Sequence, residues 1–446
     1  MVKRPLFGTS GIRGHAEKLF TDQFCFDIGR TFVKFLDNHN IKGDMAVGID
    51  PRDSSPRIQQ ALFKGLATGN TKLFDEGITP IPSMNWVIKN TPVKASIMIT
   101  GSHIAPELNG VKFYAHDEEV SIEDQKKIEA IYEILKNKLN YPTQNPLITK
   151  ETRAKELYIK LLRDTANNGL PKWKVALDCA NGAQSVVIPE LFSSLGFEVV
   201  KVNCDTDKAF IARDTDTDDK AEVEDLKKKV ISENCDFGVA FDGDGDRVVF
   251  IDEKGAFVQG EYSCSLIAKE FPSEHLVTTI SASQVVDTLG KKVVRTKVGS
   301  PYVVGKMKEL KAPFGFEPNG GAVFAKTMMT RDGGTMAVNI LNLFSKFDGT
   351  FSEMIAQLPK FYMFRTKVDY KWELKDKIIS EAKKEFKGVK IEEIDGLKIW
   401  IDRQTWILFR SSANAPEFRV FAESKSENKA KDLLNSGVAF VNELVK

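Results

Sequence analysis

A short acidic segment, Asp242-Gly243-Asp244-Gly245-Asp246-Arg247, stands between two apolar runs, residues 237–241 and 248–251. Both runs are typical of buried strands. The carboxylates alternate with glycines, which allow the positive φ values that direct alternate side chains toward one point. Three like charges held together are costly unless a cation neutralises them, and ligands that are all oxygen favour Mg²⁺, Ca²⁺ or Mn²⁺. The segment therefore predicts a site for a hard cation.

Two other interpretations of this segment fit less well. A solvated acidic turn does not explain the apolar run on each side. A calcium loop of the D-x-D-x-D-G-x5-E type matches at Glu253, but its sixth position is glycine, where this chain has Arg247, and helices flank it. An arginine beside a carboxylate-bound cation is understandable when an anion such as a phosphate joins the site. We therefore interpret the three aspartates as ligands of a catalytic Mg²⁺.

Apolar runs that end in polar residues recur along the chain. They end at Asp50-Pro51-Arg52-Asp53, Thr100-Gly101-Ser102-His103, Asp178-Cys179-Ala180-Asn181-Gly182 and Arg295-Thr296-Lys297-Val298-Gly299. Helical stretches alternate with them, as in α/β domains, whose functional residues lie beyond the carboxyl ends of strands. The last part differs, because strands at 397–401 and 406–409 lie between helices at 374–386 and 427–444. This pattern predicts a small α+β domain.

Composition excludes several classes of protein. The length of 446 residues indicates three or four domains, and the net charge of +1 gives no reason to expect a nucleic-acid or membrane partner. The first residues lack the apolar core of a signal peptide, and no apolar run is long enough to span a bilayer. Five cysteines without a C-x-x-C pair fit a reducing compartment, so we expect a cytoplasmic protein.

Several other segments carry side chains suited to phosphate or sugar chemistry. Ser102 lies beside His103, and its hydroxyl needs a base or a metal to become a nucleophile; Lys112 can hold negative charge near it. An ordinary Ser-His turn is the alternative, and the lack of a G-x-S-x-G elbow argues against a hydrolase triad. Lys297 follows a strand, where a buried lysine can carry a proton and a surface lysine is the alternative.

Three glycine- or serine-containing segments offer groups for a phosphate or a sugar, and an ordinary structural loop is the alternative for each. The loop at residues 7–14, with Arg13, can hold a phosphate, and the turn at residues 317–321 offers Glu317 and Asn319 to sugar hydroxyls. The segment at residues 410–419 can bind a phosphate through its guanidinium, hydroxyl and amide groups. Its candidate residues are Arg410, Ser412, Asn414 and Arg419.

Together these segments resemble the α-D-phosphohexomutase family, which includes phosphomannomutase/phosphoglucomutase and phosphoglucosamine mutase. The matches follow the family's order and span nearly the whole chain. They are Gly8-Thr9-Ser10-Gly11-Ile12-Arg13-Gly14, Thr100-Gly101-Ser102-His103, Asn109-Gly110-Val111-Lys112, residues 242–247, Arg295-Thr296-Lys297-Val298-Gly299, residues 317–321, Arg331-Asp332-Gly333-Gly334 and residues 410–419. The glycine pair that ends the turn at Glu317 is similar to the ending of this turn in archaeal or related microbial members of the family.

The resemblance implies four domains around a central active-site cleft. Three similar α/β domains are expected at residues 1–142, 143–252 and 253–362, and a smaller C-terminal α+β domain at residues 363–446. In this order they carry the phosphoserine loop, the metal-binding loop, the sugar-binding loop and the phosphate-binding loop.

The resemblance also implies the reaction. Ser102 is expected to carry a phosphoryl group whose phosphate binds one Mg²⁺ together with Asp242, Asp244 and Asp246. The phosphoryl group passes to a hexose phosphate, and the resulting hexose 1,6-bisphosphate turns over and returns its other phosphate to the serine. Lys297 is the expected proton carrier, with His103 as the alternative.

Supporting roles follow in the same way. Arg247 and Lys112 stabilise charge, and Glu317 and Asn319 hold sugar hydroxyls. Residues that grip the phosphates of the substrate are Arg13, Arg410, Ser412, Asn414 and Arg419. The chain departs from the family in three places: its R-P-S-G-T-E-P loop is Arg410-Ser411-Ser412-Ala413-Asn414-Ala415-Pro416, Phe316 stands where glycine is common, and Ile104-Ala105 replaces Asn-Pro.

We therefore predict a Mg²⁺-dependent phosphohexomutase, a monomer or homodimer whose partners are small hexose phosphates. Phosphomannomutase/phosphoglucomutase is the first choice and phosphoglucosamine mutase the second. A phosphatase that hydrolyses the serine phosphate and a non-catalytic sugar-phosphate-binding protein are the alternatives from other classes.

Overall fold

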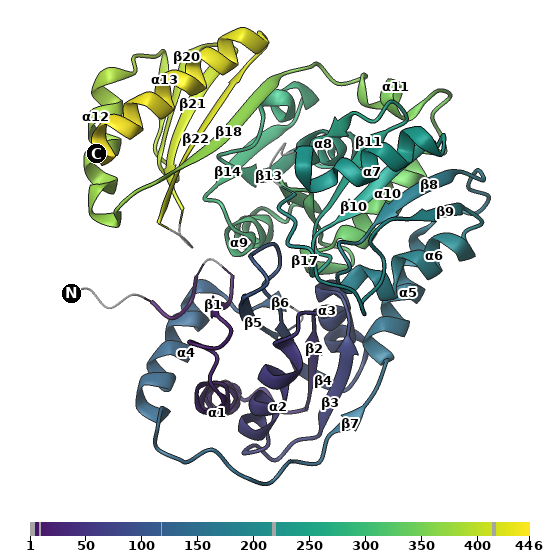
Figure 1. Cartoon of the computed structure of the whole chain (residues 1–446), viewed down its shortest axis with the longest axis vertical. Coiled ribbons are helices and arrows are strands. Elements are labelled where there is room, and N and C mark those ends of the chain that lie inside the picture. The colour runs from purple at the N-terminus through teal and green to yellow at the C-terminus, as the bar shows by residue number, and fades with distance from the viewer. Residues whose placement is uncertain (1–4, 9, 117, 216–219, 413–415) are drawn as a thin grey trace.

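The structure, a computed structural model, describes residues 5–8, 10–116, 118–215, 220–412 and 416–446. The chain forms four consecutive units (Figure 1), the first at the bottom in purple, the second and third in teal and green, and the fourth in yellow. Among the helices of the described ranges, none has both the length and the apolar character needed to cross a bilayer.

The first unit alternates strands and helices. It contains β1 (Ile12–His15), α1 (Asp22–Asn38), β2 (Asp44–Ile49), α2 (Ser55–Leu66), β3 (Leu73–Ile78), α3 (Ile81–Asn90), β4 (Val93–Ile99), β5 (Leu108–Ala115), β6 (Glu118–Glu119), α4 (Ile122–Leu135) and β7 (Thr149–Lys150). Helix α1 shows why such elements form. The Thr21 side chain accepts a hydrogen bond from the backbone N–H of Phe24, which caps the helix, and Cys25, Ile28 and Phe32 recur at helical spacing and are buried.

The second unit carries the acidic segment. It contains α5 (Arg153–Thr165), β8 (Lys174–Asp178), the 3₁₀ helix η1 (Ala183–Val186), α6 (Ile188–Ser194), β9 (Glu198–Lys201), α7 (Lys220–Ser232), β10 (Phe237–Phe241), β11 (Val248–Asp252) and β12 (Phe257–Val258). Its five strands lie in the order β12-β11-β10-β8-β9. The two strands predicted beside the aspartates are β10 and β11, which pair antiparallel with Phe241 opposite Val248.

Alternate residues of β10 and β11 fill two different cores. Phe237, Val239 and Phe250 belong to the large core shared with the third unit, whereas Ala240 and Ile251 pack with α7. Because side chains alternate between the two faces of a sheet, both faces are covered and every residue of the two strands is buried. The acidic segment therefore starts and ends on rigid strands.

The third unit shares a sheet with the first. It contains α8 (Gly260–Glu270), β13 (His275–Thr279), η2 (Gln284–Leu289), β14 (Lys292–Thr296), α9 (Ser300–Leu310), β15 (Phe314–Glu317), β16 (Gly321–Phe324), β17 (Met328–Arg331), α10 (Gly333–Phe344) and α11 (Phe351–Ile355). The shared sheet has twelve strands in the order β14-β13-β15-β16-β17-β6-β5-β4-β2-β3-β7, with β1 beside β5. Its two halves join where Met329 of β17 pairs with Glu118 of β6.

The fourth unit is a five-stranded sheet with helices. It contains β18 (Tyr362–Asp369), η3 (Trp372–Leu374), α12 (Lys375–Glu385), β19 (Lys390–Glu392), β20 (Leu397–Asp402), β21 (Thr405–Ser411), β22 (Glu417–Ser424) and α13 (Glu427–Val445). All its strand pairs are antiparallel, in the order β18-β22-β21-β20-β19. The predicted fold class, three α/β units followed by a smaller α+β unit, is confirmed.

The three boundaries between the four domains stay predictions. Strand β7 pairs with β3 and lies beyond residue 142, and β12 pairs with β11 and lies beyond residue 252. Sheet pairing therefore continues past two of the predicted positions.

The fourth unit docks on the third through a buried lysine. Lys398 of β20 is fully buried, donates a hydrogen bond to the carbonyl of Ile280 at 3.1 Å and lies 3.7 Å from the ring centroid of Trp406. Burial, followed by repulsion from Arg295, lowers the pKa of Lys398 to about 7, against the pull of the carboxylates of Glu423, Glu392 and Asp287.

We expect this lysine to make stability depend on pH. Between the folded pKa of about 7 and the usual value of 10.5 the unfolded chain binds more protons, so the free energy of unfolding rises with pH in this window. Each pH unit adds up to about 1.4 kcal/mol. Urea unfolding between pH 7 and pH 9.5 measures this rise. Lys398→Met should lose it and Lys429→Met, an exposed lysine of the same unit, should keep it; an equal slope in Lys398→Met contradicts the prediction.

Candidate active site

The three aspartates of the acidic segment converge as predicted. Asp242, Asp244 and Asp246 are buried, and one oxygen of each lies within 4.8 Å of the others. Of the two glycines, Gly245 has a φ of +73°, whereas Gly243 serves a close approach: a Cβ there would lie 2.8 Å from the carbonyl oxygen of Ser102. The missing side chain at residue 243 therefore lets the acidic loop reach the serine loop of the first unit.

Ser102 follows β4 and reaches the aspartates. Its Oγ donates to Asp242 Oδ2 at 3.0 Å and lies 3.4 Å from His103 Nδ1. The residue is fully buried and has a φ of +53°, and its backbone N–H donates to Thr100 Oγ1 at 2.8 Å. A non-glycine residue in the left-handed region persists only where its surroundings hold it. The hydroxyl is thus presented to the acidic loop by an ordered turn.

Arg52 holds that turn, and the sequence prediction did not include it in the site. Its two terminal nitrogens donate to four backbone carbonyls, of Ser102, Ile104, Ala105 and Leu108, at 2.7–2.9 Å. Its Nε donates to Asp50 at 3.0 Å. The position at the end of a predicted strand, in Asp50-Pro51-Arg52-Asp53, was the available signal, but such a signal does not say which loop the arginine contacts.

Cations surround the aspartates. Lys112 Nζ lies 2.9 Å from Asp244 Oδ2, and Arg247 Nε lies 3.5 Å from Asp242 Oδ2. Burial and then the charges of Asp244 and Asp246 raise the pKa of Asp242 well above its usual value. Burial also acts to raise the pKa of Asp244, but Lys112, Arg247 and Arg331 outweigh it and lower that pKa. The protein's own cations therefore outweigh burial at Asp244 but not burial and repulsion at Asp242.

The donor set fits a hard divalent cation. Oδ1 of Asp244 and Oδ1 of Asp246 are buried and have no hydrogen-bond partner within the part of the chain that the structure describes. Buried carboxylate oxygens without partners are costly, and the raised pKa of Asp242 shows that a further positive charge would be favourable there. Oxygen-only ligands at this spacing suit Mg²⁺.

The third unit contains the turn predicted to bind the sugar. Glu317 ends β15 and accepts hydrogen bonds from the backbone N–H of Gly299 at 3.0 Å and from Arg331 at 2.6 Å. Asn319 accepts from the N–H of Gly321 at 3.0 Å. Arg331 also contacts Asp246, so this turn is tied to the acidic loop. Arg13 is on β1 opposite Gly110 of β5, and its Nε has no hydrogen-bond partner among the described residues.

The predicted phosphate segment belongs to the fourth unit and includes the end of β21 and the start of β22. Arg410 and Arg419 face each other across the two strands, and the N–H of Ser412 donates to the carbonyl of Glu417 at 2.8 Å. Asn414 lies outside the described residues, as does Ala413. Asp395 joins this segment to the third unit, because its Oδ2 accepts from Arg410 Nε at 2.6 Å and from the N–H of Val298 at 3.1 Å.

Comparison with known proteins identifies the family. Residues 4–139 match the family model "Phosphoglucomutase/phosphomannomutase, alpha/beta/alpha domain I", residues 156–255 match that of domain II and residues 251–362 match that of domain III. The chain belongs to the α-D-phosphohexomutase family. The resemblance seen in the sequence is confirmed, and the chain is a mutase enzyme with phosphohexomutase function.

Similar phosphohexomutases align over the whole chain. The chain is 35% identical to the phosphoglucomutase/phosphomannomutase of Thermococcus kodakarensis, over 99% of both chains. It is 29% identical to the probable phosphoglucosamine mutase of Methanopyrus kandleri, over 99% of this chain and 98% of that one.

Solved structures share the phosphohexomutase fold. A phosphoglucomutase/phosphomannomutase family protein from Burkholderia thailandensis superposes with a TM-score of 0.83 at 21% identity, covering 100% of this chain and 98% of that one. An N-acetylphosphoglucosamine mutase from Aspergillus fumigatus, solved with GlcNAc-6P and magnesium, superposes with a TM-score of 0.64 at 15% identity, covering 100% and 96%.

The two candidate proton carriers of this phosphohexomutase differ in position. Lys297 is exposed, and its Nζ lies 5.9 Å from the ring centroid of Tyr302. His103 lies beside Ser102, and burial followed by the charge of Arg247 lowers its pKa well below the usual value, so the ring is neutral at pH 7. The roles of both residues stay predictions.

Asp395 gives a test of the phosphate segment. We expect Asp395→Ala to raise KM for a hexose phosphate about fivefold with little change in kcat, because Arg410 loses the partner that orients it and binding loses about 1 kcal/mol. Steady-state kinetics measure the effect. Asp376→Ala removes an exposed carboxylate of the same unit and should change neither constant. A fall in kcat at constant KM in Asp395→Ala contradicts the expectation.

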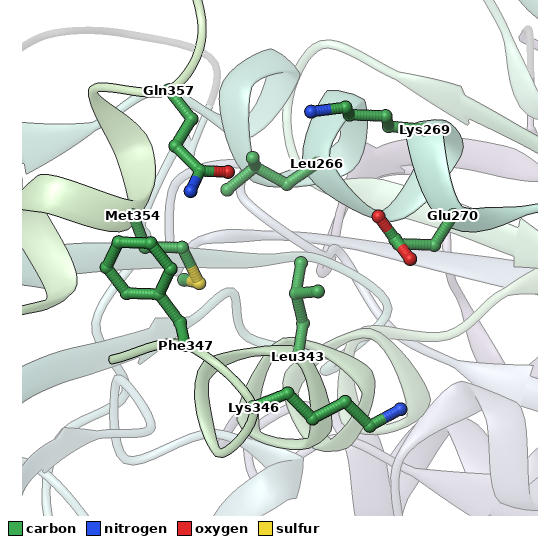
Figure 2. A pocket seen from close by; sticks show the side chains of 8 residues that line it. All are labelled: Leu266, Lys269, Glu270, Leu343, Lys346, Phe347, Met354 and Gln357. Carbon is green, nitrogen blue, oxygen red and sulfur yellow. The ribbon is translucent and has the colours of Figure 1, made fainter. Parts of the chain in front are cut away.

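A separate hollow lies among α8, α10 and α11. It encloses about 100 Å³, and Leu266, Leu343 and Met354 point into it while Lys269 and Lys346 lie at one side (Figure 2). None of the predicted site residues lines it. It is not part of the candidate active site.

Proposed function

We propose that the enzyme interconverts hexose 6-phosphates and hexose 1-phosphates through a phosphoserine at Ser102 and a hexose 1,6-bisphosphate intermediate. The observation that carries this proposal is the 3.0 Å contact between Ser102 Oγ and Asp242 Oδ2, in a loop whose three aspartates converge. Phosphoryl transfer depends on placement and charge neutralisation, and both are available at this hydroxyl.

One Mg²⁺ per chain is the proposed cofactor, held by Asp242, Asp244, Asp246 and the phosphate on Ser102. When bound, it supplies positive charge to the phosphoryl group in transit. The chain's own cations act beside it: Lys112 and Arg247, both buried against the aspartates, bind the phosphoryl oxygens. Lys297 is the proposed proton carrier, and His103, whose neutral ring lies 3.4 Å from Ser102 Oγ, is the alternative.

Two groups of residues hold the substrate in this proposal. Glu317 and Asn319 accept hydrogen bonds from sugar hydroxyls, and each already has a protein donor that fixes its orientation. The phosphate that is not reacting binds at the β21–β22 turn, with Arg410 as its main contact. A bisphosphate that turns around presents its other phosphate to Ser102 while the first occupies this turn, which explains why the two phosphate sites belong to different units.

Phosphomannomutase/phosphoglucomutase is the proposed activity, and phosphoglucosamine mutase is the second candidate. The relative from Thermococcus kodakarensis, at 35% identity, favours the first, and the relative from Methanopyrus kandleri, at 29%, supports the second. A monomer or a homodimer is the proposed state. The proposed location is the cytoplasm, in keeping with five free cysteines.

A coupled assay with mannose, glucose and glucosamine phosphates side by side tests the proposal. We expect turnover of mannose and glucose phosphates in the presence of Mg²⁺ and a trace of hexose 1,6-bisphosphate, and slower turnover of glucosamine phosphate. A preference for glucosamine phosphate favours the second candidate. Net release of inorganic phosphate identifies a phosphatase, and binding without turnover, with no phosphate on the protein, identifies a binding protein.

A further inference from the structure

Arg331 contacts two loops that the proposed reaction uses for different purposes. It ends β17, and its side chain is only 6% exposed. Its Nε and Nη2 donate to Asp246 Oδ2 at 3.1 and 2.6 Å, and its Nη1 donates to Glu317 Oε2 at 2.6 Å. One guanidinium therefore binds a carboxylate of the cation trio and the carboxylate of the sugar-binding turn.

The arrangement leaves one oxygen of each carboxylate able to bind a further group. Asp246 Oδ1 has no hydrogen-bond partner within the described residues, because both contacts from Arg331 go to Oδ2. Among the described residues, Glu317 Oε1 accepts one hydrogen bond, from the N–H of Gly299, and a carboxylate oxygen can accept a second. The orientation of both carboxylates is set by the same planar group.

Gly321 makes room for this side chain. A Cβ at residue 321 would lie 2.5 Å from Arg331 Cδ and 3.0 Å from Asn319 Oδ1. Gly321 is not among the residues with positive φ, so the clash concerns packing and not backbone conformation. Gly321, the second glycine of the pair at the end of the sugar-binding turn, thus has a physical partner in Arg331, ten residues further along the chain.

We propose that Arg331 is a positioning residue of the mutase reaction, which holds Asp246 in the geometry that binds the cation and Glu317 in the geometry that binds the sugar. This rests on the proposed function for the roles of Asp246 and Glu317. The arginine holds two carboxylates from different units at a fixed distance from each other. The cation and the sugar that they bind are thereby placed relative to each other.

Removing Arg331 leaves Asp246 to other cations. Lys112 Nζ lies 3.7 Å from Asp246 Oδ2, and Arg247 Nε lies 3.7 Å from Oδ1. With its main partner gone, the carboxylate turns toward Arg247, which then occupies the oxygen that serves the cation. Lysine does not replace arginine here, because a single ammonium group lacks the planar fork that reaches both carboxylates.

The first experiment measures binding and not turnover. Mn²⁺ affinity is determined by electron paramagnetic resonance for the purified full-length protein and for Arg331→Lys and Arg331→Met. We expect both variants to bind Mn²⁺ about tenfold more weakly than the parent, as is usual when a partner of a metal ligand is removed. Arg30→Met, which removes another arginine–aspartate pair on α1, should leave the affinity unchanged. Unchanged Mn²⁺ affinity in Arg331→Lys overturns the proposal, since charge alone then suffices.

The sugar side is measured without metal. In the Ser102→Ala background, calorimetry with glucose 6-phosphate in EDTA should show about tenfold weaker binding after Arg331→Lys. Equal affinity overturns the link to Glu317. Without turnover of any hexose phosphate by the parent, the proposed function fails, whereas the Mn²⁺ comparison still decides whether Arg331 orients Asp246.

Gly321→Ser gives an independent variant that keeps every charge. We expect it to lower Mn²⁺ affinity by displacing Arg331, and to add little to Arg331→Met, because both changes disturb the same contact. Fully additive losses overturn the proposal. This variant also keeps the test valid if Arg331→Met, which leaves two buried carboxylates with fewer partners, fails to fold.

Discussion

Replacing Ser102 by alanine is expected to lower kcat by at least about 10³-fold, because the proposed reaction needs the Ser102 hydroxyl to accept the phosphoryl group. The fold should be retained, since Ser102 Oγ makes two side-chain contacts in the described residues, a 3.0 Å hydrogen bond to Asp242 Oδ2 and a longer contact of 3.4 Å to His103 Nδ1. Coupled assays measure the rate, and intact-mass spectrometry should show one phosphate on the parent protein and none on the variant.

The matched control is Ser96→Ala. Ser96 is also a fully buried serine of the first unit, on β4, and its Oγ donates to the carbonyl of Met84 at 3.1 Å. We expect this variant to lose about 1 kcal/mol of stability and no activity. Ser102→Ala with activity close to that of the parent would remove the serine from the reaction. The phosphate is labile, so the parent protein is incubated with hexose 1,6-bisphosphate before its mass is measured.

The second large effect is expected for Asp242→Asn, which should lower kcat by about 10²- to 10³-fold without destabilising the protein in EDTA. The loss of rate corresponds to several kcal/mol of charge stabilisation by the cation. Stability is kept because the buried Asp242 carboxylate is repelled by Asp244 and Asp246, as its raised pKa indicates, and a neutral amide of the same shape removes that repulsion.

Thermal melts with and without Mg²⁺ separate the two effects. A ligand that binds only the folded state raises the melting temperature, so Mg²⁺ should stabilise the parent and leave Asp242→Asn unaffected. Asp252→Asn, at the other end of β11, is the control: its carboxylate accepts from the N–H groups of Lys254 and Ala256 at 3.0 and 2.8 Å, and the response to Mg²⁺ should persist. If Mg²⁺ does not change the melting temperature of the parent protein, the proposed cation site is contradicted.

Local patterns in the chain were sufficient to predict the strands and helices, and also the strand ends at which the candidate functional residues lie. The strands on both sides of the acidic segment, β10 and β11, followed from apolar runs bounded by glycine and charge, because burial on both faces demands such runs. The convergence of the three aspartates followed from their spacing with glycine. Family resemblance then assigned roles to residues whose own sequence context was weak, such as Ser102 and Glu317.

Contacts between segments far apart in the chain were beyond the reach of local patterns. Arg52 holds the serine turn from another strand end, Arg331 joins Asp246 to Glu317, and Asp395 joins Arg410 to the loop after β14. Spacing along the chain says nothing about which loop a long side chain will meet, since that depends on how the sheets pack. The exposure of Lys297 was also beyond the sequence. Its place after a strand fitted both a buried and a surface lysine, and the structure shows it exposed.

What the sequence by itself determined here is the set of strands, helices and chemically active loops, since each depends on interactions between neighbours in the chain. Only the tertiary structure decided which of those loops are joined by ion pairs and which side chains orient them. The reason is physical: a buried ion pair such as Arg331–Asp246 forms between residues 85 positions apart, and its existence depends on the packing of whole units.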